Sequence, residues 1–191
     1  MSDYLSVGFT GHRPNLIFGT YSWEDPEVKK CCRVLSRQIG ELIRDFNVRV
    51  FISGGALGID QLAYVLVHQY KLKYPELNIQ NILASPFKNQ DVKWNHIDRK
   101  RYKHIVDTAD KVVYVDELAE YQSKNANMNQ IGKYKREKMQ KRNEYIVDHI
   151  DILLGVFNGS KSGTKNCIDY AKKERKSTII LDPNNNFNKA V

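Results

Sequence analysis

Three glycine-containing turns are the segments whose residue types could do chemistry. They lie at 11–14 (Gly-His-Arg-Pro), 54–58 (Gly-Gly-Ala-Leu-Gly) and 159–164 (Gly-Ser-Lys-Ser-Gly-Thr), and each follows an apolar run. Glycine lets backbone N–H groups approach an anion, and a helix after the turn adds the partial positive charge of its N-terminus. None of the turns matches the GxxxxGK(S/T) phosphate loop. Either the glycines serve only as tight-turn residues or the three turns together form a phosphate site, and their recurrence favours the site.

Polar residues beside these turns are candidate ligand contacts. His12 and Arg13 follow the first apolar run, and Asp60 lies in the first turn of a predicted helix, where it either accepts hydrogen bonds from a ribose or favours the helix N-terminus. Thr164 and Asn166 lie at the start of a later predicted helix. Thr164 is a phosphate ligand, a helix cap or both, and Asn166 is either a ligand contact or a plain polar residue of the first turn. The glycines predicted to contact the ligand with them are Gly11, Gly54, Gly55, Gly58 and Gly163.

Alternating strands and amphipathic helices must position these turns. The alternation predicts an α/β fold with a mostly parallel sheet, in which ligands bind outside the carboxyl ends of the strands. We expect a single domain over residues 1–183, a lid-like connection at 116–134 and a loose tail at 184–191. The predicted strands are 5–10, 48–53, 79–84, 111–115, 152–157 and 177–181, and the predicted helices are 26–46, 59–70, 91–108, 137–149 and 164–174.

Composition excludes several classes of protein. The chain has 191 residues, of which 41% are hydrophobic, enough for a core, and no apolar run approaches the roughly 20 residues that span a bilayer. The N-terminus lacks the basic start and apolar stretch of a secretory signal. Three cysteines, two of them adjacent at Cys31 and Cys32, suit neither a disulfide framework nor a zinc site. We expect a cytoplasmic protein with no membrane partner, no metal and no cofactor.

The net charge of +8 is concentrated in two segments, 88–103 and 124–142. These basic residues are either solvated helix faces or a rim that attracts a phosphate-bearing ligand. Trp94 and Tyr102 lie among the first group, a pattern typical of a groove for single-stranded nucleic acid. The alternative is that Trp94, Ile97 and Ile105 form the buried stripe of that helix.

An ordered set of four motifs carries a family resemblance. The motifs are Thr10–Pro14 (TGHRP), Ser53–Asp60 (SGGALGID), Met139–Asn143 (MQKRN) and Gly163–Asn166 (GTKN). Together they resemble the YpsA-like branch of the SLOG superfamily, over about residues 5–181. This superfamily includes the lonely-guy phosphoribohydrolases and the DNA-processing protein DprA. The resemblance implies a Rossmann-like three-layer domain that binds nucleotides.

The resemblance also bears on activity. Met139–Asn143 matches the MxxRK motif of lonely-guy enzymes with Arg142 retained and Asn143 in place of lysine, which adds Arg142 to the predicted ligand contacts. The glutamate of their PGGxGTxxE motif falls at Cys167, and a thiol does not replace a carboxylate that stabilises an oxocarbenium-like centre.

These departures favour binding over cleavage. We expect the chain to bind a nucleotide or a nucleotide-derived, ADP-ribose-like molecule at the carboxyl edge of the sheet, as a sensor or a sequestering protein. One alternative is a nucleotide N-glycosidase, for which no catalytic residue is assigned. The second alternative is binding of single-stranded DNA, because SGGALGID also resembles a segment of DprA, which binds such DNA. A homodimer remains open as a further partner.

Overall fold

The structure, a computed structural model, describes residues 4–122 and 130–190. The strands are β1 (Leu5–Gly11), β2 (Val48–Ser53), β3 (Gln80–Ser85), β4 (Lys111–Tyr114), β5 (Ile152–Val156), β6 (Ser177–Asp182) and β7 (Asn188–Lys189). The α-helices are α1 (Pro14–Ile17), α2 (Pro26–Asp45), α3 (Ile59–Lys73), α4 (His96–Thr108), α5 (Arg136–Asp148) and α6 (Gly163–Lys173). The 3-10 helices are η1 (Pro75–Leu77), η2 (Val115–Glu117), η3 (Ala119–Tyr121) and η5 (Pro183–Asn185).

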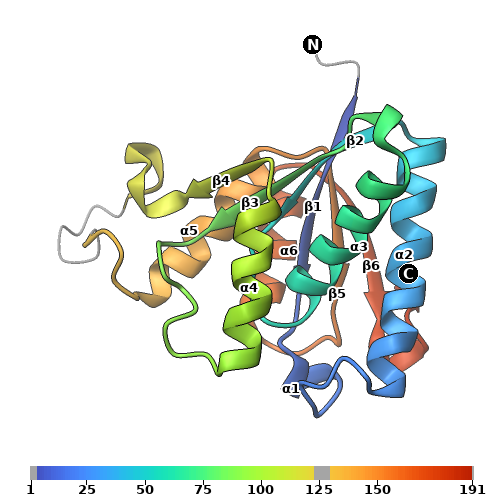
Figure 1. The fold of residues 1–191 in the computed structure, drawn as a ribbon, viewed down its shortest axis with the longest axis horizontal. Helices are drawn as coiled ribbons and strands as arrows, with labels where there is room; N and C mark the ends of the chain where they lie inside the picture. The colour runs from blue at the N-terminus through green and yellow to red at the C-terminus, as the bar shows by residue number, and fades with distance from the viewer. Residues whose placement is uncertain (1–3, 123–129, 191) are drawn as a thin grey trace.

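The seven strands form one sheet in the order β4-β3-β2-β1-β5-β6-β7. Every neighbouring pair is parallel except β6–β7. Helices α2, α3 and α4 cover one face of the sheet, and α5 and α6 cover the other (Figure 1). This arrangement confirms the predicted α/β, Rossmann-like three-layer fold with a mostly parallel sheet.

Helix starts and apolar stripes follow from local sequence. Asp25 caps α2, because its carboxylate accepts hydrogen bonds from the N–H groups of Glu27 and Val28. The stripe that begins at Val28 and includes the fully buried Cys31 packs α2 on the sheet. Cys31 and Cys167 are buried and Cys32 is half-buried, all three as free thiols. Among the described helices, none is long and apolar enough to cross a membrane.

The C-terminal tail differs from its prediction. Residues from 184 onward were expected to be loose, but β7 pairs antiparallel with β6, and Phe187 is buried in the core beside α2. A single large apolar ring supplies enough burial to order a short polar segment, and Asp182 caps the turn at Asn184. The lid-like connection predicted at 116–134 begins with the 3-10 helices η2 and η3, and its residues 123–129 lie outside the described residues.

Candidate functional site

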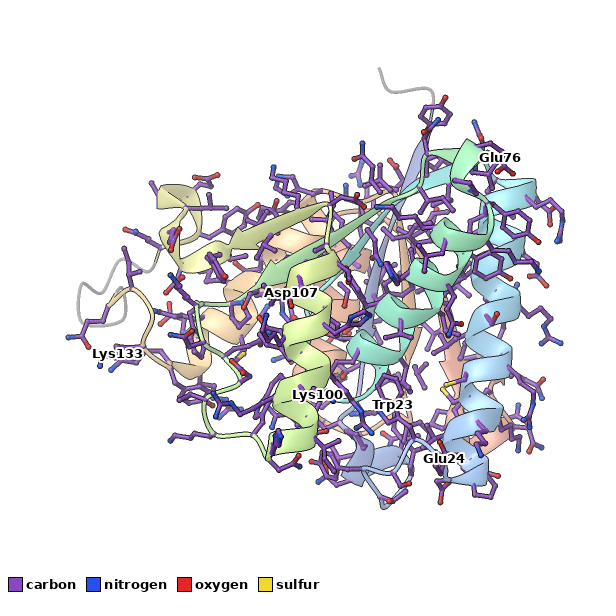
Figure 2. All side chains as sticks on the ribbon, viewed as in Figure 1. Trp23, Glu24, Glu76, Lys100, Asp107 and Lys133 are labelled. Carbon is purple, nitrogen blue, oxygen red and sulfur yellow. The ribbon has the colours of Figure 1, made fainter. Side chains whose placement is uncertain are left out.

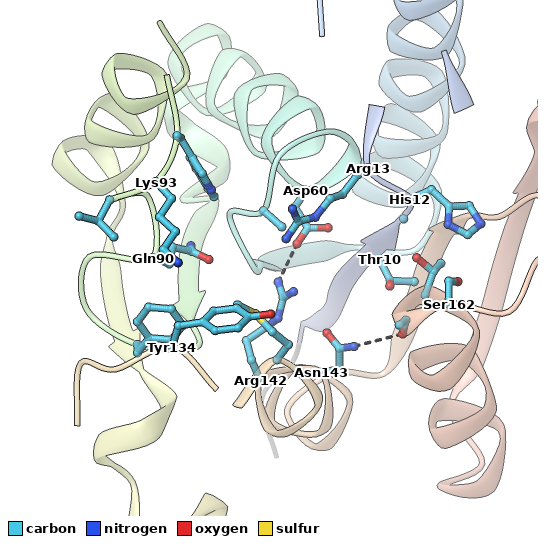
Figure 3. A pocket seen from close by; sticks show the side chains of 18 of the residues that line it. Thr10, His12, Arg13, Asp60, Gln90, Lys93, Tyr134, Arg142, Asn143 and Ser162 are labelled. Atoms are coloured by element: carbon cyan, nitrogen blue, oxygen red, sulfur yellow. Dashed lines mark hydrogen bonds and ion pairs between the residues drawn. The ribbon is translucent and has the colours of Figure 1, made fainter. Parts of the chain in front are cut away.

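A cavity of about 820 Å³ lies at the carboxyl edge of the sheet. Its walls come from the end of β1, the turn before α3 and the start of that helix, the segment after β3, the segment before α5, and the helices α5 and α6 (Figure 3). This is the edge at which open parallel sheets bind ligands, because the helices that follow the strands begin there. The predicted turns that reach the cavity are far apart in sequence, and they meet there because their strands end at the same edge of the sheet.

One end of the cavity suits an anion, and we call it the anion end. The first turn of α6 opens into it, and the N–H groups of Gly163 and Thr164 have no acceptor within the helix, because helix geometry leaves the first turn unpaired. Ser162 caps the helix by accepting a hydrogen bond from the N–H of Lys165. The lining residues of this end are Thr10, His12, Ser162, Gly163 and Thr164, whereas the side chain of Arg13 is directed to Asp60 (Figure 3).

His12 is the most buried polar group of the anion end. Its side chain is 2% exposed, and its ring stacks on Phe157 with the centroids 5.4 Å apart. Burial lowers the pKa of His12, and a hydrogen bond with Asn158 opposes this change. Within the described part of the chain, Nε2 of His12 has no hydrogen-bond partner. His12 therefore lines the cavity with a buried imidazole that has one nitrogen without a partner among the described residues.

A buried ion pair crosses the middle of the cavity. Nη1 of Arg142 on α5 donates to Oδ2 of Asp60 on α3 over 2.7 Å, and both side chains are less than a tenth exposed (Figure 3). Burial raises the pKa of Asp60, and the neighbouring guanidinium opposes that rise. Arg142 was predicted to contact the ligand, but Nη1 of its guanidinium is already bonded to Asp60. Its Nε is buried and has no partner among the described residues.

Gly54 makes room for this ion pair. A Cβ atom at residue 54 would lie 1.1 Å from Nη1 of Arg142. Gly55 and Gly58 have φ angles of +67° and +100°, and side chains there would meet Leu83 and the backbone of His12, respectively. The predicted ligand contacts Gly54, Gly55 and Gly58 do not line the cavity. Their sequence signal reflects close packing around the site, so direct ligand contact at these three positions stays untested.

The cavity brings together most of the other predicted residues: Gly11, His12, Arg13, Asp60, Arg142, Gly163 and Thr164. Asn166 does not join them, since its side chain is exposed and outside the lining. Asn143 was missed as a contact and lines the cavity instead, with Nδ2 donating to the carbonyl oxygen of Gly163 over 3.2 Å. Its place one residue after Arg142 in the MQKRN motif was an available signal.

The end of the cavity opposite His12 is aromatic. Phe87, Gln90, Trp94 and Tyr134 line it, and we call these four residues the aromatic end (Figure 3). The rings of Phe87 and Tyr134 meet edge to face at 6.1 Å between centroids. Sequence analysis missed this end as a small-molecule site. The signal available was that residues 87–94 follow β3, whose carboxyl end reaches the same edge of the sheet as those of β1 and β2.

The basic segments divide between the surface and the interior. Lys100 and Lys133 lie on the outside (Figure 2), whereas Lys138 and Arg142 are buried in ion pairs with Asp116 and Asp60. The two interpretations of residues 94–105 both need correction. Tyr102 is 4% exposed and packs on Trp94, so it is not available for base stacking, and Ile97 is 65% exposed, so it is not part of a buried stripe.

The position that carries a glutamate in lonely-guy enzymes is closed to acid–base chemistry. Cys167 is buried, and burial raises the pKa of its thiol to about 11. Asp169 is exposed and forms an ion pair with Lys165, outside the cavity. Among the described residues that line the cavity, the carboxylate is that of Asp60, which Arg142 holds.

Comparisons with known proteins agree with this architecture. The YpsA family model, described as the YspA SLOG family, matches residues 7–182. The uncharacterized SPbeta prophage-derived protein YoqJ of Bacillus subtilis (strain 168) is 43% identical over 150 residues, which cover 78% of this chain and 85% of that protein. A UPF0398 protein of Bacillus thuringiensis (strain Al Hakam) is 25% identical over 169 residues, covering 88% and 83%.

Two solved structures share the fold. DNA processing protein A (DprA) of Streptococcus pneumoniae superposes with a TM-score of 0.55 at 16% identity and covers 93% of this chain, which spans 50% of that protein. DNA processing protein A of Helicobacter pylori, whose structure describes a single-stranded DNA binding mode, gives 0.54 at 20% identity, covering 95% and 70%. With the family match extending from β1 to the end of β6, this chain belongs to the YpsA family of the SLOG superfamily.

Proposed function

We propose that this chain binds a nucleotide or a nucleotide-derived molecule in the cavity at the carboxyl edge of the sheet. The observation that carries the proposal is one cavity that is lined by the first turn of α6 and by His12 and Arg142, each of which has a buried nitrogen atom, Nε2 and Nε respectively, without a partner among the described residues. Native proteins rarely leave such atoms unsatisfied, and those that do often use them at a site. Membership of the SLOG family, for which the sequence resemblance implies nucleotide binding, supports the same assignment.

The phosphate would bind at the anion end. The N–H groups of Gly163 and Thr164 and the partial charge of the α6 N-terminus favour an anion there. Arg13 also lines the cavity, with its side chain directed to Asp60, whose pKa its charge helps to hold down (Figure 3). Asn143 bonds the carbonyl oxygen of Gly163, so it keeps that turn in place from α5. The sugar would then lie near Arg142 and Asp60, which offer a donor and an acceptor for its hydroxyl groups.

The size of the cavity supports a ligand of ADP-ribose dimensions. Its volume of about 820 Å³ lies toward the top of the roughly 300–1,000 Å³ found for small-molecule sites. Binding without cleavage suits a sensor or a sequestering protein. The alternative of N-glycoside cleavage needs a free carboxylate, and Asp60 is held by Arg142.

A charge-matched pair of variants tests the anion end. Gly163→Asp and Gly163→Asn are nearly the same size, and a Cβ at residue 163 meets no atom within 4 Å. An aspartate also favours a helix N-terminus, so this variant keeps α6 folded. We expect Gly163→Asp to weaken binding of AMP and ADP-ribose about 10–100-fold relative to Gly163→Asn in calorimetric titrations, because it sets a negative charge beside the phosphate.

The same titrations separate the alternatives. Chromatography of the mixtures would detect release of the base, which would favour the N-glycosidase. If the protein neutralised six or more phosphates of a single-stranded oligonucleotide, its affinity would fall about 10³-fold or more between 50 and 200 mM salt. Such a slope, with no mononucleotide binding, would overturn the proposal in favour of DNA. Equal affinities of the two Gly163 variants would place the anion elsewhere.

A further inference from the structure

We propose that the aromatic end of the cavity is a nucleobase subsite and that the buried ion pair between Lys138 and Asp116 positions it. The inference rests on the proposed function, since it assigns the base once the phosphate lies at the anion end. It goes further by assigning the nucleobase to the aromatic end and by naming two residues outside the cavity lining, Lys138 and Asp116, that position that end.

The rings of the aromatic end are available in a way that core rings are not. Tyr134 lines the cavity and is 61% exposed, and it rests against the buried ring of Phe87. Trp94 forms another wall and is fixed by its edge-to-face contact with Tyr102 at 5.3 Å. An exposed tyrosine supported from behind by a buried ring loses little conformational entropy when a flat ligand stacks on it.

Amide groups accompany these rings. Gln90 is 8% exposed, and its Nε2 donates to the carbonyl oxygen of Gly54 over 3.2 Å, which fixes the side chain. Asn89 lines the cavity beside it. Amides next to aromatic faces are the groups that proteins use to hydrogen-bond base edges while a ring stacks on the base. A sugar phosphate without a base would use none of these groups.

The ion pair contacts the aromatic end from behind. Oδ2 of Asp116 accepts from Nζ of Lys138 over 2.8 Å and from the N–H of Gly132 over 2.9 Å. Nζ of Lys138 also donates to the carbonyl oxygen of Gln130. It lies 5.7 Å from the centroid of the Phe87 ring. The two charged side chains therefore fix the backbone just before Tyr134, and Lys138 also lies over the ring on which Tyr134 rests.

The burial of this pair argues against a role in stability alone. The side chains of Lys138 and Asp116 are 7% and 2% exposed. Removing two charges from water is costly, and apolar residues of similar volume often stabilise a fold as well or better. The charges do something that apolar residues could not, because they capture backbone groups of the segment that carries Tyr134. We infer that Lys138 and Asp116 are positioning residues for the base subsite.

Two kinds of probe, sugar phosphates with a base and one without a base, test the subsite. The four nucleoside 5′-monophosphates and ribose 5-phosphate are titrated into the wild type, Tyr134→Ala and Tyr134→Phe. Loss of one stacking ring weakens binding about tenfold. We therefore expect Tyr134→Ala to weaken the tightest monophosphate about tenfold, to leave ribose 5-phosphate within twofold, and Tyr134→Phe to remain close to the wild type. Equal losses for both probes, or no loss, would overturn the subsite.

The positioning role is tested with the double variant Lys138→Met/Asp116→Leu, which leaves no unpaired buried charge. We expect it to keep a cooperative thermal transition and to lower the ratio of monophosphate to ribose 5-phosphate affinity about as much as Tyr134→Ala does. An unchanged ratio would reduce the pair to a structural element. Gly163→Asp weakens both probes, so its failure would count against the proposed function, whereas failure of the Tyr134 or double variants alone would count only against this inference.

Discussion

Two buried ion pairs leave the same face of α5 one turn apart, and they differ in what their cations have left to offer. Arg142 uses Nη1 on Asp60 and keeps a buried Nε without a partner in the described residues. The ammonium group of Lys138 donates to Asp116 and to the carbonyl oxygen of Gln130. Arg142 lines the cavity and Lys138 does not. Under the proposed function Arg142 belongs to the ligand site, whereas the ion pair of Lys138 holds the backbone segment that precedes Tyr134.

The comparison also corrects how Arg142 should respond to mutation. Arg142 was predicted as a ligand contact, but its ion pair with Asp60 makes it part of the folded framework as well. The four predictions below test this difference, beginning with the largest effect.

Arg142→Met should cause the largest loss. It leaves the carboxylate of Asp60 buried without its partner, which costs about 3–5 kcal/mol in comparable cases. We expect a loss of that size in the free energy of unfolding from urea denaturation. The double variant Asp60→Asn/Arg142→Met removes the uncompensated charge and should recover most of the loss. Wild-type stability of Arg142→Met would show that the ion pair contributes nothing to folding.

Gly54→Ala should break the same ion pair by steric conflict, without removing a charge. Its Cβ would overlap Nη1 of Arg142, and forcing one extra carbon into a packed site costs about 1–3 kcal/mol. Gly163→Ala is the matched control, because its Cβ would meet nothing within 4 Å. We expect thermal melting to drop for the first variant and to stay near the wild type for the second. Equal melting temperatures would contradict the crowding around Arg142.

The anion end should respond to pH through His12. Burial lowers the pKa of His12 in the folded chain below its ordinary value of 6.5. The unfolded chain therefore binds the proton more readily, so the stability that His12 contributes is present above pH 6.5 and is lost as the pH falls toward the lowered pKa. Urea denaturation between pH 7.5 and 5 should show a shallower decline for His12→Gln than for the wild type. Parallel curves would mean that the imidazole titrates normally.

A surface pair provides the smallest effect. Lys103 and Asp107 form an exposed i, i+4 ion pair on α4, with side chains 74% and 52% exposed. Exposed pairs of this kind contribute about 0.3–0.5 kcal/mol. Lys103→Met should therefore change the free energy of unfolding by no more than that, and the effect should vanish in 1 M salt. If Lys103→Met lowered the free energy of unfolding as much as Arg142→Met does, burial would not explain the difference between the surface pair and the buried pair.

The sequence by itself determined the layout of the fold. Apolar runs of strand length, the stripe from Val28 to Leu42 and the cap at Asp25 are local patterns, so they predict elements without knowledge of their neighbours. The parallel sheet followed from the alternation of those elements, and its carboxyl edge explains why Gly11, His12, Asp60 and Gly163 meet. The tail departed from this pattern, since one ring, Phe187, reaches the core from beyond the predicted end of the domain. The helix predicted over 91–108 begins at His96, where Asn95 caps it by accepting a hydrogen bond from the N–H of Asp98.

Tertiary structure alone decided what each residue of the site faces. Gly54 follows its strand as a phosphate-binding glycine would, yet its neighbour in space is the guanidinium of Arg142, 88 positions along the chain. Lys138 belongs to a run of basic residues that looks solvated, and only the fold brings it to Asp116. Tyr102 and Tyr134 are the same residue type in similarly basic surroundings, but one is buried and the other exposed. Charge, size and spacing are local properties, whereas burial and partners depend on distant segments that only the folded sheet brings together.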